Sequence, residues 1–186
     1  MNTGAVSEKH NPGGKVRPSW PADSKVKAVF SDCEQYRYQL SEVWDSAKPL
    51  VLWVLMNPSV ACTAYSDPTL RKTGRFARAW GYGGQLVWNV HAYRATNKKE
   101  LLEVADPVGP ENDQHIMTMA ARAKTVVLAY GQPPKALRQR AVQVVDMLAQ
   151  HPELCHLRLA KDGTPMHPLY LPNALRPVPH RQPARN

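Results

Sequence analysis

The run Leu50–Met56 is the feature that most constrains the fold. Its seven residues, LVLWVLM, are all apolar, without alternation of polar and apolar positions. Such a run predicts a strand buried on both faces, as in parallel sheets that helices cover on both sides. Pro58 follows closely, and proline cannot donate a hydrogen bond to a neighbouring strand. We therefore expect the chain to fold around a sheet with both faces covered.

A polar loop and a helix come next. Asp67 is a favourable N-cap, and Pro68 suits the first helical position. We expect this helix to end near Trp80, with Gly81 just beyond its C-terminal end. The segment is thus strand, polar loop and helix, which in an open α/β sheet places the loop where ligands bind.

The remaining chain repeats this alternation. Further apolar runs predict strands, and Pro or cap residues mark the helices between them. The expected strands are 84–90, 125–130 and 155–160, and the expected helices are 98–104, one opening at Pro110, and 133–150. Residues 26–31 and 36–44 predict a half-exposed antiparallel hairpin. The predicted fold class is α/β, a three-layer α/β/α sandwich with a mainly parallel central sheet of about four strands plus the N-terminal hairpin.

Composition divides the chain into three parts. Residues 1–21 are polar and rich in Gly and Pro, which predicts a disordered or loosely packed segment. Residues 22–172 are expected to form a single α/β domain. Residues 173–186 are a basic, Pro-rich C-terminal tail that carries Arg176, Arg181 and Arg185.

The net charge of +9 predicts an anionic partner, with nucleic acid or a nucleotide first and a phosphorylated small molecule second. A basic protein without such a partner remains an alternative. No apolar run approaches the roughly 18 residues of a membrane span, so no membrane association is expected. Three cysteines without paired spacing favour reduced thiols and a cytoplasmic location. The oligomeric state is left open.

The motifs of several common nucleotide-binding and hydrolase sites are missing from the sequence. The chain has no GxxxxGK[ST], no GxGxxG after a strand and no GxSxG. His151, Cys155 and His156 lack the paired spacing of zinc ligands and are interpreted as a loop. We therefore expect neither a cofactor nor a metal.

Polar residues gather after the predicted strands. If the strands are parallel, their carboxyl ends meet at one edge of the sheet, and these side chains converge there. The candidate catalytic residues are Asn57, Asp67 and His167, and the candidate substrate-binding residues are Ser59, Asn89, Tyr93, Arg94, Lys161 and Asp162. Two alternatives stay open: loops are polar in any protein, and Asp67 is explained by its capping role.

Arg71, Arg75 and Arg78 form one stripe along the predicted helix that begins at Pro68. Arginines in such an arrangement suit phosphate groups, and Arg71 and Arg75 are the candidate phosphate-binding residues. A solvated helix face is the alternative interpretation.

The order of several motifs resembles a known family. The segments MNPS, DPTLRK, FARAWGYGG, NVHAYRAT, DPVGPEND and KDGTPMHPLYLP look like the bacterial and phage domain-of-unknown-function family 1643 over about residues 50–172. That resemblance supplies no activity.

A more distant similarity links the chain to the uracil-DNA glycosylase superfamily. A strand ending in Asn-Pro, a second ending in Asn, a third ending in Gly and a late His-Pro loop carry it. The resemblance implies that Asn57 positions water or stabilises a sugar cation, that Asn89 reads a base, and that His167 donates to a base carbonyl. The chain departs from that pattern in its late loop, which reads HPLYLP.

Three hypotheses follow. The first is an enzyme that acts on a nucleobase or nucleic acid, with His167 stabilising the leaving base and Asp67, Asp113 or Asp162 as the carboxylate. The second is a binding module for nucleic acid or nucleotides that performs no reaction. The third is an enzyme that acts on a small phosphorylated nucleoside.

Overall fold

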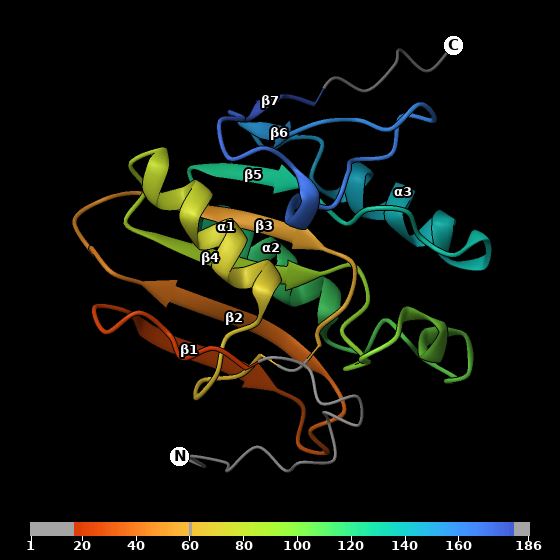
Figure 1. The fold of residues 1–186 in the computed structure, drawn as a ribbon. Coiled ribbons are helices and arrows are strands. Elements are labelled where there is room, and N and C mark those ends of the chain that lie inside the picture. The colour runs from red at the N-terminus through yellow and green to blue at the C-terminus, as the bar shows by residue number, and fades with distance from the viewer. Residues whose placement is uncertain (1–16, 60, 181–186) are drawn as a thin grey trace.

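A computed structural model describes residues 17–59 and 61–180 (Figure 1). It is a mixed α/β fold whose strands form one seven-stranded sheet in the order β1-β2-β4-β3-β5-β6-β7. The strands are β1 (Lys25–Phe30), β2 (Arg37–Val43), β3 (Leu50–Leu55), β4 (Gly84–Asn89), β5 (Thr125–Leu128), β6 (Leu154–His156) and β7 (Val178–Pro179). The helices are α1 (Pro68–Ala79), α2 (Asn112–Arg122) and α3 (Arg138–Met147), with 3-10 turns η2 (Lys98–Leu102), η3 (Lys135–Leu137) and η4 (Pro168–Tyr170).

The centre of the sheet is parallel and its edges are antiparallel. Strands β4, β3, β5 and β6 run parallel, whereas β1–β2, β2–β4 and β6–β7 pair antiparallel. The register pairs Leu55 at the end of β3 with Asn89 at the end of β4. The loops that follow these two strands therefore begin side by side.

Two apolar clusters lie on opposite faces of β3, because successive side chains of a strand alternate between faces. Leu52 and Val54 belong to a cluster that contains residues of α2 and α3, while Val51 and Trp53 belong to a cluster that contains residues of α1. Figure 1 shows α1 crossing in front of the sheet and α2 behind it. Burial on both sides explains why the Leu50–Met56 run has no polar position.

The start and end of α1 follow their sequence signals. Asp67 is the N-cap, with extended backbone, and its side chain accepts a hydrogen bond from the Leu70 amide at 2.8 Å. Pro68 occupies the first turn, where its missing N–H costs nothing. Gly81 follows the C-cap with φ of 85°, a backbone region that favours glycine. The predicted limits of this helix are confirmed.

The sheet is larger than predicted. The antiparallel hairpin is confirmed, and its second strand β2, which lies between β1 and β4, alternates as expected: Tyr38 and Leu40 are buried, whereas Gln39 and Ser41 are partly exposed. The strand predicted at 155–160 is β6, which is short, and the helix predicted at 98–104 is the 3-10 turn η2. The remaining strand β7 pairs with β6 at the edge of the sheet, a place that tolerates Pro179 because an edge strand has a neighbour on one side only.

Segments near both ends of the described chain pack against the domain. The Trp20 indole donates to the Cys62 carbonyl at 2.9 Å, and the Trp80 indole donates to the Leu175 carbonyl at 3.0 Å. Most of the predicted N-terminal segment, together with Arg181 and Arg185 of the tail, lies outside the described residues. Within the described ranges, no helix combines the length and the apolar character that crossing a bilayer requires.

Candidate functional site

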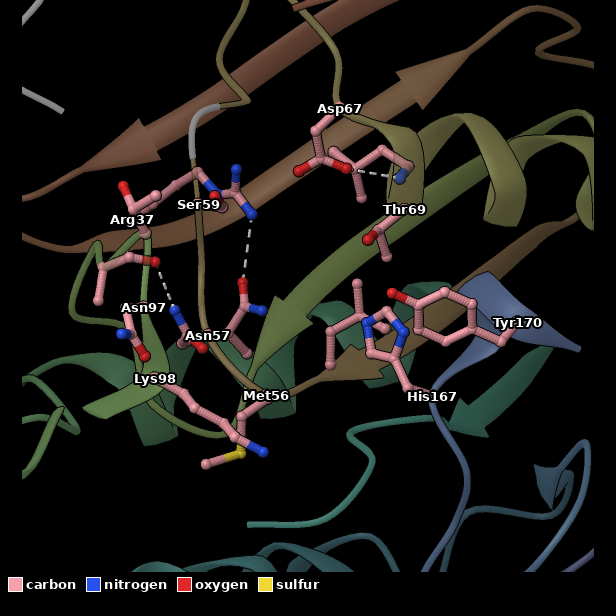
Figure 2. Close-up of a pocket in the computed structure, with 15 residues that line it drawn as sticks. Arg37, Met56, Asn57, Ser59, Asp67, Thr69, Asn97, Lys98, His167 and Tyr170 are labelled. Carbon is pink, nitrogen blue, oxygen red and sulfur yellow. Dashed lines mark hydrogen bonds between the residues drawn. The ribbon is translucent and has the colours of Figure 1, made fainter. Parts of the chain in front are cut away.

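A cavity of about 470 Å³ opens beyond the carboxyl ends of β3 and β4 (Figure 2). It is lined by Arg37, Leu55, Met56, Asn57, Ser59, Asp67, Thr69, Leu70, Asn89, Ala95, Thr96, Asn97, Lys98, His167 and Tyr170. Its position follows from the strand order. The chain leaves β3 for β4 on one side and then crosses to β5 on the other side of β3, and such a reversal creates a crevice in open α/β sheets.

Asn57 follows β3 and presents an acceptor to the cavity. Its side-chain amide donates to the carbonyls of Ala95, at 2.8 Å, and of Pro58, at 3.1 Å. Two carbonyl partners require that this group be the NH₂, which fixes the orientation of the amide. Within the described residues, Oδ1 of Asn57 accepts no hydrogen bond, so it remains available to a ligand.

Asn89 is the last residue of β4, and it contributes a hydrogen-bond donor where Asn57 contributes an acceptor. Its Oδ1 accepts a hydrogen bond from the Arg37 guanidinium at 3.2 Å, and the side chain is only 2 % exposed. Its Nδ2 is buried and has no partner among the described residues. An unpaired buried donor is uncommon in folded proteins and calls for an explanation. Asn89 lines the cavity, so this donor lies in the cavity wall.

Arg37, the first residue of β2, is a buried cation in the wall of the cavity. It is 3 % exposed, and its guanidinium also donates to the Ala61 carbonyl at 2.8 Å, whereas Nε has no partner in the described structure. Burial lowers the pKa of Arg37 to about 10, while the Asp67 carboxylate acts in the opposite direction. The side chain is still a cation at neutral pH.

His167 is held by a loop that packs against the end of β5. A Cβ on Gly131, just beyond β5, would lie 3.0 Å from the His167 Cβ, a tight contact, and the φ of 66° at this position also favours glycine. Nδ1 of His167 accepts a weak hydrogen bond from the Leu169 amide at 3.4 Å, which places the ring hydrogen of the neutral form on Nε2. Burial lowers the pKa of His167, an effect that the Asp67 carboxylate opposes and Lys98 reinforces, so the ring is mostly neutral at pH 7.

Asp67 contributes a carboxylate where α1 begins. One oxygen is committed to the Leu70 amide, and the side chain is partly exposed in the cavity wall. Its charge acts electrostatically on both Arg37 and His167. Asp67 is therefore a helix cap and a cavity group at the same time.

Two further groups complete the rim. Lys98 donates to the Gln132 carbonyl at 3.1 Å and so ties the loop after β4 to the loop after β5. The Tyr170 side chain of η4 is 87 % exposed, which leaves its ring free to stack on a bound molecule. Figure 2 shows Asn57 and Lys98 on one side of the cavity and Thr69 and His167 on the other.

The structure thus brings together five of the predicted residues, namely Asn57, Ser59, Asp67, Asn89 and His167. Others lie outside the cavity lining. Arg94 donates to the Glu34 carbonyl and stacks over Phe30 at 4.9 Å, and Tyr93 makes an edge-to-face contact with Tyr36.

Asp162 accepts a hydrogen bond from Gln132, and Lys161 is an exposed neighbour of it. Arg71 and Arg75 line a second hollow of about 220 Å³, together with Pro21, Glu42, Leu70, Gly74 and Arg78. We call this hollow the α1 groove.

Sequence reasoning missed Arg37, Thr69, Lys98 and Tyr170. The sequence patterns point to polar residues at the carboxyl ends of parallel strands, whereas Arg37 lies at the start of an antiparallel strand. Tyr170 lies two residues after the His167-Pro168 pair, so that motif could have pointed to it. Among the described residues, no group of three or more His, Cys, Asp or Glu side chains is arranged to hold a metal ion.

Most of the chain, including nearly all of the cavity, matches one known protein family. Residues 37–169 match the family model described as "Protein of unknown function (DUF1643)". The chain belongs to this family. The region that matches DUF1643 contains every residue that lines the cavity except Tyr170. No curated protein and no solved structure matches the chain.

Proposed function

We propose that this DUF1643 protein is a nucleobase-processing enzyme that hydrolyses an N-glycosidic bond in its cavity. The observation that carries the proposal is the meeting of Asn57, Asn89, His167 and Asp67 around one cavity of about 470 Å³. Its volume lies in the usual range for small-molecule sites. The sequence resemblance to the uracil-DNA glycosylase superfamily implies roles for three of these residues, Asn57, Asn89 and His167.

The two amides suit a nucleobase. Asn57 offers an acceptor, because its NH₂ is held by backbone carbonyls, and Asn89 offers an unpartnered donor. A donor and an acceptor on opposite amides complement the mixed polar edge of a base. Tyr170 at the rim supplies an aromatic surface on which a base stacks.

The other two residues suit the reaction. As the bond between C1′ and the base nitrogen breaks, its electron pair moves to the base, and Nε2–H of neutral His167 stabilises that charge. The sugar becomes cationic, and the Asp67 carboxylate stabilises it and takes a proton from the attacking water. Water supplies the new C1′ oxygen, and the departing base is finally protonated.

Nucleic acid is the partner class that the basic composition favours, and a base in a duplex would first be flipped into the cavity. One observation favours the second candidate function, a binding module without chemistry. Asp67 already serves as the N-cap of α1, and a cap explains this carboxylate without catalysis.

Base release separates the two functions. The protein is incubated with oligonucleotides that contain uracil, hypoxanthine or modified bases, and separately with free nucleosides and nucleotides, and the released base is measured by chromatography. We expect release from at least one class, and a loss of about 100-fold in His167→Gln, since that variant lacks the ring donor. Saturable binding without release from any substrate would establish the binding module and overturn the enzyme.

A further inference from the structure

The inner wall of the cavity holds more hydrogen-bond donors than its surroundings use. A guanidinium has five N–H groups, and in the described structure Arg37 directs one to the Ala61 carbonyl and one to Asn89. Its Nε and the Asn89 Nδ2 are buried without partners. Together these atoms form an array of unused donors around one cation, which we call the Arg37–Asn89 recess.

The positive charge of Arg37 also has no carboxylate in direct contact among the described residues. Within the described ranges, no carboxylate oxygen lies within 4.0 Å of its guanidinium. Asp67 attracts it through space, but one oxygen of that carboxylate is committed to capping α1. A buried cation without a paired anion is costly to fold, and an anionic ligand in the cavity would offset that cost.

The wider cavity has the same character. Lys98 adds a second cation at the rim, His167 adds a neutral donor, and Asp67 is the one carboxylate among the lining residues of the described structure. The formal charge of the lining is therefore positive at neutral pH. Donors that reach a ligand from several directions suit a phosphate monoester, whose three terminal oxygens accept hydrogen bonds, better than a planar carboxylate.

We propose that the Arg37–Asn89 recess binds the terminal phosphate of a free mononucleotide. This inference rests on the proposed function and deepens it, because it names the substrate class of the same cavity. It reassigns the Asn89 donor from the base to the phosphate. The recess lies in the cavity wall, and a terminal monoester has three unshared oxygens to place against it, whereas the diester phosphate of an internal DNA nucleotide is tethered on both sides. The remaining lining residues, Asn57, His167 and Tyr170, then face the nucleoside.

Equilibrium binding tests the recess without requiring turnover. Isothermal titration calorimetry on the full chain compares inorganic phosphate, deoxyribose 5-phosphate, the four deoxynucleosides, their 5′-monophosphates and a single-stranded oligonucleotide. We expect the preferred monophosphate to bind at least 10-fold more tightly than its nucleoside, as charge-assisted hydrogen bonds typically give. We also expect saturable binding of deoxyribose 5-phosphate.

Two variants assign that preference to the recess. Arg37→Gln should bind the monophosphate and the nucleoside equally, whereas Arg122→Gln, which removes an exposed arginine of α2, should keep the preference. Because Arg37 also holds the Ala61 carbonyl, its loss can impair folding. Asn89→Asp avoids this problem: it places a carboxylate beside Arg37 in a side chain of the same size, so the fold is kept while the phosphate is repelled.

The outcomes are distinct from those of the base-release assay. A phosphate preference that disappears in Asn89→Asp supports the recess even if no base is ever released. Equal binding of nucleoside and monophosphate by the native chain, or a preference that survives both Arg37→Gln and Asn89→Asp, overturns the recess even if base is released. Tighter binding of the oligonucleotide than of every mononucleotide also overturns it, in favour of DNA.

Discussion

The cavity and the α1 groove are both basic, but their charges are handled in opposite ways. In the groove, Arg78 makes a two-pronged contact with Asp23 at 2.9 Å and stacks over Trp44 at 4.0 Å. Glu42, 2 % exposed, accepts hydrogen bonds from Ser24 and Gln85, each at 2.6 Å. The groove thus satisfies much of its charge internally, whereas the cavity leaves the buried Arg37 without a carboxylate partner in the described structure.

This difference teaches that the number of arginines in a segment is a poor guide to an anion site. Three arginines spaced along α1 attract attention in the sequence, yet Arg71 donates to the Ser19 carbonyl and Arg78 pairs with Asp23. A single arginine at the start of β2 is the one enclosed in the cavity wall. Changes in the cavity should therefore affect ligand chemistry, and changes in the groove should affect stability.

The largest effect is expected for Asp67→Asn. Asparagine caps helices about as well as aspartate, so the free energy of unfolding should change by less than about 0.5 kcal/mol. Loss of the carboxylate should lower the rate of base release by about 100-fold or more. Chromatography of released base and thermal unfolding measure the two quantities. An unchanged rate would reduce Asp67 to a structural cap.

Acid should destabilise the fold through His91, which is fully buried and lies outside the cavity lining. Both of its ring nitrogens lack partners in the described structure. Burial, and secondarily Arg140, lowers the pKa of His91 to about 4 from 6.5. The unfolded chain therefore binds more protons below pH 6.5, and stability is lost as the pH falls from 6.5 toward 4. The loss approaches about 3 kcal/mol.

Urea unfolding at pH 7.5 and pH 4.5 measures that loss. His91→Phe keeps a ring of similar shape and removes the titration, so its stability should depend less on pH than that of the native chain. His156, His167 and His180 have lowered pKa values for the same first reason, burial, and should account for part of the residual dependence. An identical pH dependence in His91→Phe would show that His91 contributes nothing to it.

A smaller effect is expected for Arg78→Ala in the α1 groove. The variant loses a partly exposed ion pair and a cation–π contact, which together should cost about 1 kcal/mol of unfolding free energy. Base release should not change. Arg75→Ala, from the same helix, is the matched control for stability and should change it by less than about 0.5 kcal/mol. A fall in base release with Arg78→Ala would show that the groove and the cavity act together.

The smallest effect is expected for Arg71→Gln combined with Arg75→Gln. If these arginines bind backbone phosphates, the double variant should reduce the salt dependence of oligonucleotide binding by a slope of about 2, with little change in sequence preference. Fluorescence anisotropy at several salt concentrations measures the slope. An unchanged slope would show that this stripe is a solvated helix face. Of the two basic regions, the cavity would then be the one that binds anions.

Much of the fold could be predicted because its signals are local. The apolar run of β3, the Asp67 cap and the positive φ of Gly81 each depend on a few neighbouring residues. The convergence of Asn57, Asn89 and His167 also followed from local patterns, since each lies in a loop or strand end that the alternation of strands and helices directs to one sheet edge.

The tertiary structure decided the rest. Arg37 meets Asn89 across 52 residues of sequence only because β2 pairs with β4. Strand β7 exists because an edge of β6 is available to a short, proline-containing segment. Sequence alone determined which residues can form strands, caps and polar loops, because those preferences are local. Which arginine is enclosed and which is neutralised depended on partners that only packing brings together.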